Sequence, residues 1–173
     1  MEHIGSTIAD TATVGLRIAG RLVGDIPAER FGRLARSADQ IIQSNHPAFA
    51  IGHLCLYPVE VLKLLGQDAT AAQPPGGYEV FSKNAQCQDD VDGTLYPPSS
   101  DIIEFFNRSH EAALAALRNA SNAQLSADNP RESALQQLCP TLGSLLNFYM
   151  TSHVTLHLGQ LSAWRRMEGM PPA

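Results

Sequence analysis

The sequence predicts an all-α protein, a four-helix bundle formed by a single domain that covers residues 1–173. Along four long stretches, apolar residues recur at steps of three and four, the spacing of one face of an α-helix. Nowhere does an apolar–polar alternation of period two persist, as a half-buried strand would require. The chain has 173 residues, of which 44% are hydrophobic and 17% are charged, so it can bury one core.

The first half of the chain holds two of the long helices. The second of these begins at Pro47, because proline suits the first turn of a helix, and ends at Gly66. Pro58 lies inside this stretch and should kink it, because proline has no backbone N–H and crowds the preceding turn. The other expected elements are a long helix at residues 5–23, a short helical piece at 28–37, and helix or loop at 37–45.

A long crossover, residues 67–100, separates the second helix from the third. It contains two Pro-Pro pairs and one Gly-Gly pair, and an irregular loop of this length inside a domain is often functional. We expect it to cross the body of the domain and form the rim of a pocket, although a crossover without function is an equal alternative. After it come a third long helix capped by Ser99 or Ser100, a loop at 122–129, a short helical piece at 130–138, and one long helix at 140–170.

The charge and hydropathy of the chain argue against several classes of partner. The formal net charge is −5, and the longest basic run is Arg165–Arg166, which gives no footprint for nucleic acid. No stretch approaches 18 consecutive apolar residues, so no membrane span is expected. The first ten residues lack the basic and apolar regions of a signal peptide, which predicts a cytoplasmic protein.

The three cysteines, Cys55, Cys87 and Cys139, are an odd number without CxxC spacing. This pattern does not indicate a disulfide framework, and we expect free, mostly buried thiols. Cys87 lies in a polar loop, so it is the one candidate for a catalytic thiol, although no motif supports that role.

Three histidines lie on helical faces that otherwise consist of core residues. His153 and His157 are one turn apart on the last helix, and His53 occupies an apolar stripe of the second helix. Neutral imidazoles bind divalent transition metals, and bundles form metal sites from side chains on facing helices. Three imidazoles leave positions open for water or substrate, as in catalytic sites. The alternative is that all three are core histidines that form local hydrogen bonds.

The remaining histidines fit structural roles better than a metal site. His46 lies near the start of the second helix, where capping or contact with solvent is expected. His110 should pack or form hydrogen bonds inside the third helix, and His3 should be solvated.

Two segments, FAIGHL at 49–54 and HVTLHLGQLSAWRRMEG at 153–169, resemble the DinB/YfiT-like superfamily of metal-dependent proteins. Its pattern is a histidine in an apolar run on the second helix, followed by HxxxHxGQ on the fourth. The resemblance implies an up-down-down-up bundle with a divalent ion, zinc, nickel or iron, on His53, His153 and His157. It also implies a small-molecule substrate, in some members a low-molecular-weight thiol as cosubstrate, and a homodimer.

Three further residues lie near the predicted ligands in spacing. Gln160, one turn beyond His157, could orient a ligand or substrate, and Tyr57, one turn after His53, could donate a hydrogen bond at the pocket. Glu60 could act as a general base or as a partner of a ligand. For each of them, ordinary packing or solvation is the alternative. The sequence identifies neither a nucleophile nor a convincing general base.

These observations favour a metal-dependent enzyme, either a thiol-dependent transferase or a hydrolase. One alternative is a non-catalytic protein of the stress response that binds a metal or a small molecule. Another is a helical interaction protein whose histidines are purely structural.

Overall fold

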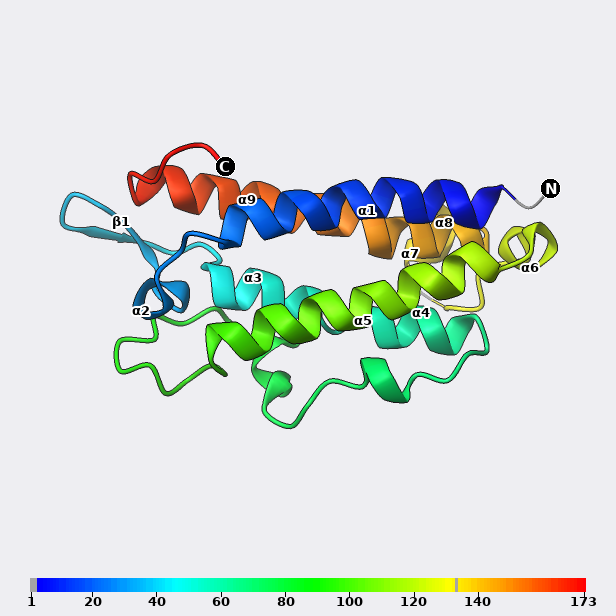
Figure 1. The fold of residues 1–173 in the computed structure, drawn as a ribbon, viewed down its shortest axis with the longest axis horizontal. Coiled ribbons are helices and arrows are strands. Elements are labelled where there is room, and N and C mark those ends of the chain that lie inside the picture. Colours follow the sequence, from blue (N-terminus) through cyan, green and yellow to red (C-terminus); the bar gives the residue numbers. More distant parts are fainter. Residues whose placement is uncertain (1–2, 133) are drawn as a thin grey trace.

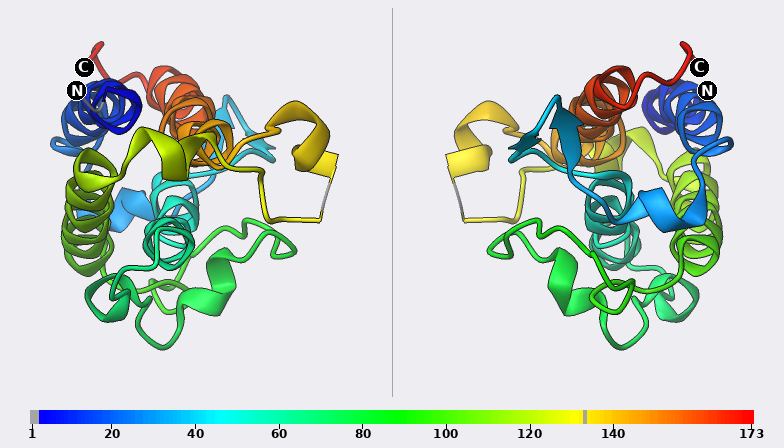
Figure 2. Two further views of the ribbon diagram at one scale, coloured as in Figure 1. Left: turned by 90° about the vertical axis from the view of Figure 1, so that its right-hand side faces the viewer. Right: turned by 90° about the vertical axis from the view of Figure 1, so that its left-hand side faces the viewer.

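The computed structural model describes residues 3–132 and 134–173, and most of its regular structure is helical, as predicted (Figure 1). Contacts of α1 with α5 and α9, and of α3 with the same two helices, enclose a common core (Figure 2). The four helical stretches are α1, Ile4–Val23; α3, Pro47–Leu54, with α4, Pro58–Leu64; α5, Ser99–Asn119; and α8, Leu142–Asn147, with α9, His153–Met167.

The first and last stretches run in one direction along the molecule, and the two middle stretches run in the opposite direction (Figure 1). This order arises because the chain between α4 and α5 returns the length of the molecule before α5 begins. Helix α1 crosses α5 at very short range near Gly5, where an added Cβ would lie 2.0 Å from the carbonyl oxygen of Leu117. Helix α5 begins at Ser99, with Pro98 rather than a serine in the capping position.

The second stretch is two helices, where the sequence predicted one kinked helix. Helix α3 ends at Leu54, and α4 begins at Pro58 after a turn that contains Tyr57. Proline cannot donate the backbone hydrogen bond that a continuous helix needs at that position, so it becomes the first residue of a new helix instead. The break places Tyr57 in the turn just beyond the last residues of α3.

Residues 28–45 differ from the prediction most clearly. The expected helical piece at 28–37 is limited to α2, Ala28–Phe31, and β1, Ala35–Ser37, pairs with β2, Gln40–Ile42, in an antiparallel hairpin. At Ala38 the backbone has φ of 51°, which turns the chain between the strands. Each strand has only three residues, too few to produce a recognisable alternation of period two.

Two other short helices precede the last stretch. Helix α6, Asn122–Ser126, occupies most of the predicted loop at 122–129, and its first turn is capped by Ser121, whose hydroxyl accepts from the Gln124 amide at 3.1 Å. A serine cap of this kind stabilises even a single turn, which explains the error. Helix α7, Ala134–Leu138, lies within the predicted piece at 130–138; Ser133 lies outside the described residues.

The crossover contains two short 3₁₀ helices, Thr70–Ala72 and Tyr78–Phe81, and is fixed to the body of the protein by His46. The His46 Nδ1 atom caps α3 by accepting from the Phe49 amide at 3.2 Å, and its Nε2–H donates to the Gln88 carbonyl at 2.9 Å. The capping prediction for His46 is therefore confirmed, although the ring is fully buried rather than in contact with solvent.

The last stretch, predicted as one helix, is continuous but not uniform. A turn of π-helix, Phe148–Ser152, joins α8 to α9 directly before His153. Near the other end of α9, the Arg165 guanidinium is buried. It donates to both carboxylate oxygens of Asp25, and it donates to the Leu22 carbonyl at 2.9 Å. These bonds attach the end of α9 to the end of α1.

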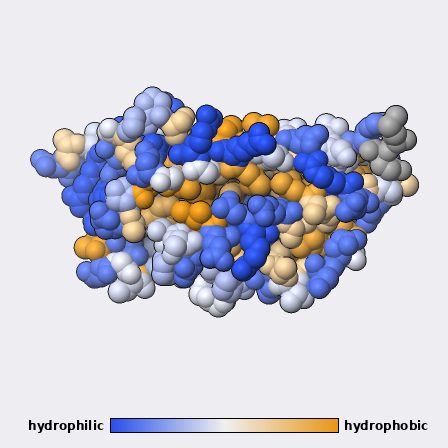
Figure 3. Space-filling model, viewed as in Figure 1, coloured by the Kyte–Doolittle hydropathy of each residue, from blue (hydrophilic) through white to orange (hydrophobic). Residues whose placement is uncertain are grey.

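Apolar residues gather in a band along the face that carries α1 and α5 (Figure 3). On α1, Val14 and Ile18 are 57% and 37% exposed, and both line a groove of about 970 Å³ between α1 and α9. The homodimer implied by the resemblance stays a prediction.

Among the described residues, no helix combines the length and the apolar character that crossing a membrane requires.

Two buried histidines outside the predicted metal site should make the free energy of unfolding depend on pH. Burial lowers the pKa of His46 and of His110 from the usual 6.5 to about 4, although each ring also donates to a backbone carbonyl. His110 therefore serves packing and hydrogen bonding, as expected. Between these pH values the unfolded chain binds more protons than the folded protein, so the free energy of unfolding should fall as the pH falls from 6.5 towards 4.

Urea unfolding of the metal-free protein between pH 6 and pH 5 checks this expectation. Each such histidine contributes a slope of at most about 1.4 kcal/mol per pH unit. The variant His110→Leu should lose one such contribution, and an unchanged slope in that variant would contradict the assignment.

Candidate metal centre

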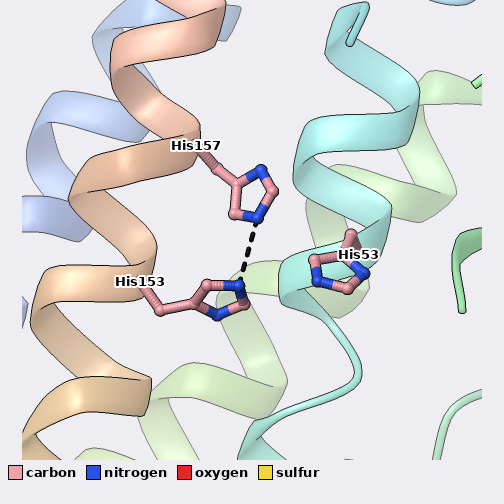
Figure 4. Close-up of side chains that lie close together, drawn as sticks. All are labelled: His53, His153 and His157. Carbon is pink, nitrogen blue, oxygen red and sulfur yellow. Dashed lines mark hydrogen bonds between the residues drawn. The ribbon is translucent and has the colours of Figure 1, made fainter. Parts of the chain in front are cut away.

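The three predicted ligands converge from two helices. His153 and His157 project from α9 towards His53 on α3 (Figure 4). Each residue is only 7–8% exposed, and one ring nitrogen from each lies within 4.8 Å of the others. The Nε2 atoms of His153 and His157 are 3.1 Å apart, close to the separation of neighbouring ligands about 2.0–2.1 Å from one ion. The three buried histidines can therefore hold a metal ion.

The separations of the three nitrogens set how well they would fit around one ion. Two nitrogens that each lie about 2.1 Å from one ion are at most about 4.2 Å apart. The three nitrogens lie within 4.8 Å of one another, so any pair wider than about 4.2 Å would have to close as the rings rotate towards an ion.

The ring of His53 is oriented by the crossover. Its Nδ1 lies 2.7 Å from the carbonyl oxygen of Phe81. A carbonyl oxygen can only accept, so Nδ1 carries the proton and Nε2 keeps its lone pair. The Tyr57 hydroxyl donates to that Nε2 at 3.1 Å. A ligating histidine is typically held by a hydrogen bond of this kind from its other nitrogen.

The ring of His157 is oriented in the same way by Gln160. The His157 Nδ1–H donates to the Gln160 side-chain oxygen at 2.9 Å, and the Asn45 amide donates to the same oxygen at 2.9 Å. The Nε2 of His157 therefore also keeps its lone pair. Gln160 has the position of a residue that orients a ligand, as the sequence suggested.

His153 is the ligand whose hydrogen bonding is incomplete. Its Nδ1 is buried and has no hydrogen-bond partner among the described residues. Without an ion, the Nε2 of His153 donates to the Nε2 of His157, which accepts with its lone pair. An ion would instead use both Nε2 lone pairs, and the proton of His153 would then reside on Nδ1.

The two histidines of α9 are neutral near pH 7. Burial, and to a lesser extent the neighbouring histidines, lower the pKa of His153 to about 3 and that of His157 to about 4. A metal ion needs the neutral ring, so protons do not compete for these two ligands at neutral pH. The donor set of three imidazoles suits zinc, nickel and iron, the metals that the resemblance implies.

A close contact in the crossover explains why the Phe81 carbonyl lies beside His53. Gly52 of α3 packs against the ring of Phe81, and a Cβ at this glycine would lie 2.5 Å from Phe81 Cζ. The missing side chain lets the crossover lie directly on the helix. The next residue along α3 is His53, so the same contact brings the carbonyl to the imidazole.

Of the other two candidates, Glu60 and Cys87, neither supplies an evident reactive group. The Glu60 carboxylate is paired with Lys63 at 3.4 Å and with Arg131. Burial raises the pKa of the Cys87 thiol to about 11, so it is protonated at neutral pH. All three cysteines are free, as expected.

Two groups that support the orientation of the ligands were not foreseen. Asn45 belongs to no motif that points to the centre, and the acceptor for His53 is a backbone carbonyl, which residue type does not reveal. The signal that was available is Gly52, since a glycine among large apolar residues inside a helix often marks a close approach.

Comparisons with models of protein families, with curated proteins and with solved structures found no match for the chain.

The Gln160 contact predicts a clear difference between two substitutions. Gln160→Leu removes the acceptor of His157 and should weaken metal binding by about 10–100-fold, the usual cost of losing such a partner. Gln160→Glu keeps an acceptor in place and should bind metal at least as tightly as the wild type. Competition with a chromophoric chelator measures both affinities, and equal losses in the two variants would contradict the assigned role.

The Gly52 contact predicts that a single methyl group disturbs the centre. Gly52→Ala should push the Phe81 ring away, lower the free energy of unfolding by about 1–3 kcal/mol, and weaken metal binding. The matched control is Gly159→Ala on α9, where nothing lies within 4 Å of an added Cβ. The control should gain up to about 1 kcal/mol from helix propensity and keep its metal affinity. Chemical unfolding and the same chelator assay test both variants, and an unaffected Gly52→Ala would refute the argument.

Proposed function

We propose that the protein is a metal-dependent enzyme that binds one divalent ion, zinc, nickel or iron, on His53, His153 and His157 and acts on a small molecule. The observation that carries this proposal is the convergence of three buried imidazoles, two of which are oriented by their own hydrogen-bond acceptors. Hydrogen bonds of this kind are typical of metal ligands, but His46 and His110 also donate to backbone carbonyls. The convergence of the three rings is therefore what distinguishes the centre.

A divalent ion held by His53, His153 and His157 would keep open positions, where it would supply a lowered pKa for a bound water or thiol near neutral pH. The residues of the chain would supply the rest. Phe81 and Gln160 hold the imidazoles in place, and the surrounding apolar residues limit access of water. This chemistry suits a thiol-dependent transferase or a hydrolase.

The arrangement of the helices supports a further part of the proposal, that the fold is a four-helix bundle of the DinB/YfiT-like kind. The stretches run up, down, down and up, and the ligands come from the second and the fourth (Figure 1). Both features agree with the two motifs that carry the resemblance.

One observation favours the alternative of a protein that binds a metal or a small molecule without turnover. The Glu60 carboxylate is engaged by two basic side chains, and Cys87 is protonated. Neither candidate is therefore available as a base or nucleophile in this arrangement.

Elemental analysis after gentle purification tests the metal site. The wild type should contain near one equivalent of metal, His153→Ala should contain almost none, and His110→Leu, which changes a buried histidine elsewhere, should match the wild type. If the wild type neither contains metal nor takes up zinc, nickel or iron on titration, the metal site and the enzyme proposal both fail. A loaded protein would justify a screen with low-molecular-weight thiols and electrophiles, in which turnover distinguishes the enzyme from the binding protein.

A further inference from the structure

Tyr57 lies directly beside the predicted ligands, at the turn where α3 ends. The centre of its ring is 4.4 Å from that of His153, 5.3 Å from that of His53 and 5.1 Å from that of Tyr149. These rings surround it, and Pro58 follows it as the first residue of α4. The side chain is therefore held in place, with little freedom to swing away from the histidines.

The hydroxyl of Tyr57 donates to the one atom of His53 that an ion would need. Because Nδ1 of His53 is committed to the Phe81 carbonyl, the lone pair on Nε2 is the only one that His53 can offer to a metal. In the absence of an ion this lone pair accepts from the Tyr57 hydroxyl at 3.1 Å. Binding of an ion would thus remove the acceptor of a half-buried hydroxyl, and an unsatisfied donor of this kind is costly.

A new acceptor beside the hydroxyl would therefore be favoured when the ion binds. The hydroxyl already acts as a donor towards His53, so it has a proton to offer to a group that arrives beside that ring. An O–H donor beside a cation favours an anionic or strongly polar group that fills an open coordination position. A small oxygen or sulfur anion has both the charge for the ion and the lone pair for the hydroxyl.

We propose that the Tyr57 hydroxyl is the hydrogen-bond donor for the small anionic ligand or substrate group that completes the coordination of an ion on the three histidines. This inference rests on the metal site of the proposed function. It assigns Tyr57 two roles. When no ion is bound, the hydroxyl donates to the lone pair on Nε2 of His53. When an ion is bound, the hydroxyl donates to the ligand that completes the coordination and orients it.

The test uses the Co²⁺-loaded protein and azide as the probe anion, followed by visible absorption. In Tyr57→Phe, cobalt should bind at least as tightly as in the wild type, because no hydroxyl competes for the lone pair of His53. Azide should bind about tenfold more weakly, the loss expected for one hydrogen bond to a charged group. The control Tyr149→Phe removes the hydroxyl of the neighbouring ring instead, and it should leave the affinities for cobalt and for azide unchanged.

The outcomes separate this inference from the function on which it rests. Equal azide affinity in Tyr57→Phe and the wild type would overturn the inference. So would weaker cobalt binding in Tyr57→Phe with unchanged azide affinity, because Tyr57 would then be a ligand or a purely structural residue. A wild-type protein that binds no cobalt would instead overturn the proposed metal site, and circular dichroism of each variant confirms that it is folded.

Discussion

The hydrogen bond from His53 to the carbonyl oxygen of Phe81 is the interaction on which the arrangement of the centre depends. It determines which nitrogen of His53 carries a lone pair, and hence which way the ring can bind. It exists only because the crossover lies against Gly52, where no side chain separates it from the helix. The long connection between α4 and α5 is thus part of the centre and not only a means of returning the chain to the other end of the molecule.

The ion pairs of the protein and the three histidines of the centre lie in different surroundings. In the described part of the chain, ion pairs join the ends of α1 and α9 to each other and to the segments around α2 and the crossover. These pairs are Arg165–Asp25, Arg33–Asp89 and Arg30–Glu168. The Arg165 guanidinium is buried and is tolerated only with such a partner, whereas Arg30 and Arg33 are partly exposed, where an ion pair adds little to stability. These pairs therefore fix how the segments meet more than they add to stability. The three histidines instead lie among apolar and aromatic residues, where the burial that lowers the pKa of His153 and His157 leaves them available to an ion.

Much of this arrangement could be predicted from the sequence, since helical periodicity and the spacing of His153 and His157 are local properties. The helical character, the inward positions of the three histidines and the capping role of His46 followed from them. The hairpin at 35–42 did not, because its strands have three residues each. The carbonyl of Phe81 and the amide of Asn45 also could not be predicted, because contacts between distant segments depend on packing rather than on residue pattern. Membership of the DinB/YfiT-like superfamily stays a prediction.

The π-helical turn at Phe148–Ser152 has a consequence for how the last stretch tolerates changes in length. Such a turn accommodates one residue more than the α-helical ladder would, and each residue of an α-helix corresponds to a rotation of about 100°. Helices α8 and α9 therefore differ in phase by about one residue while both keep an apolar face towards the core. A deletion of one residue here would restore a regular helix but rotate His153 and His157 relative to the face of α8. The chain thus carries a local insertion whose removal would preserve the helix and lose the alignment of its histidines.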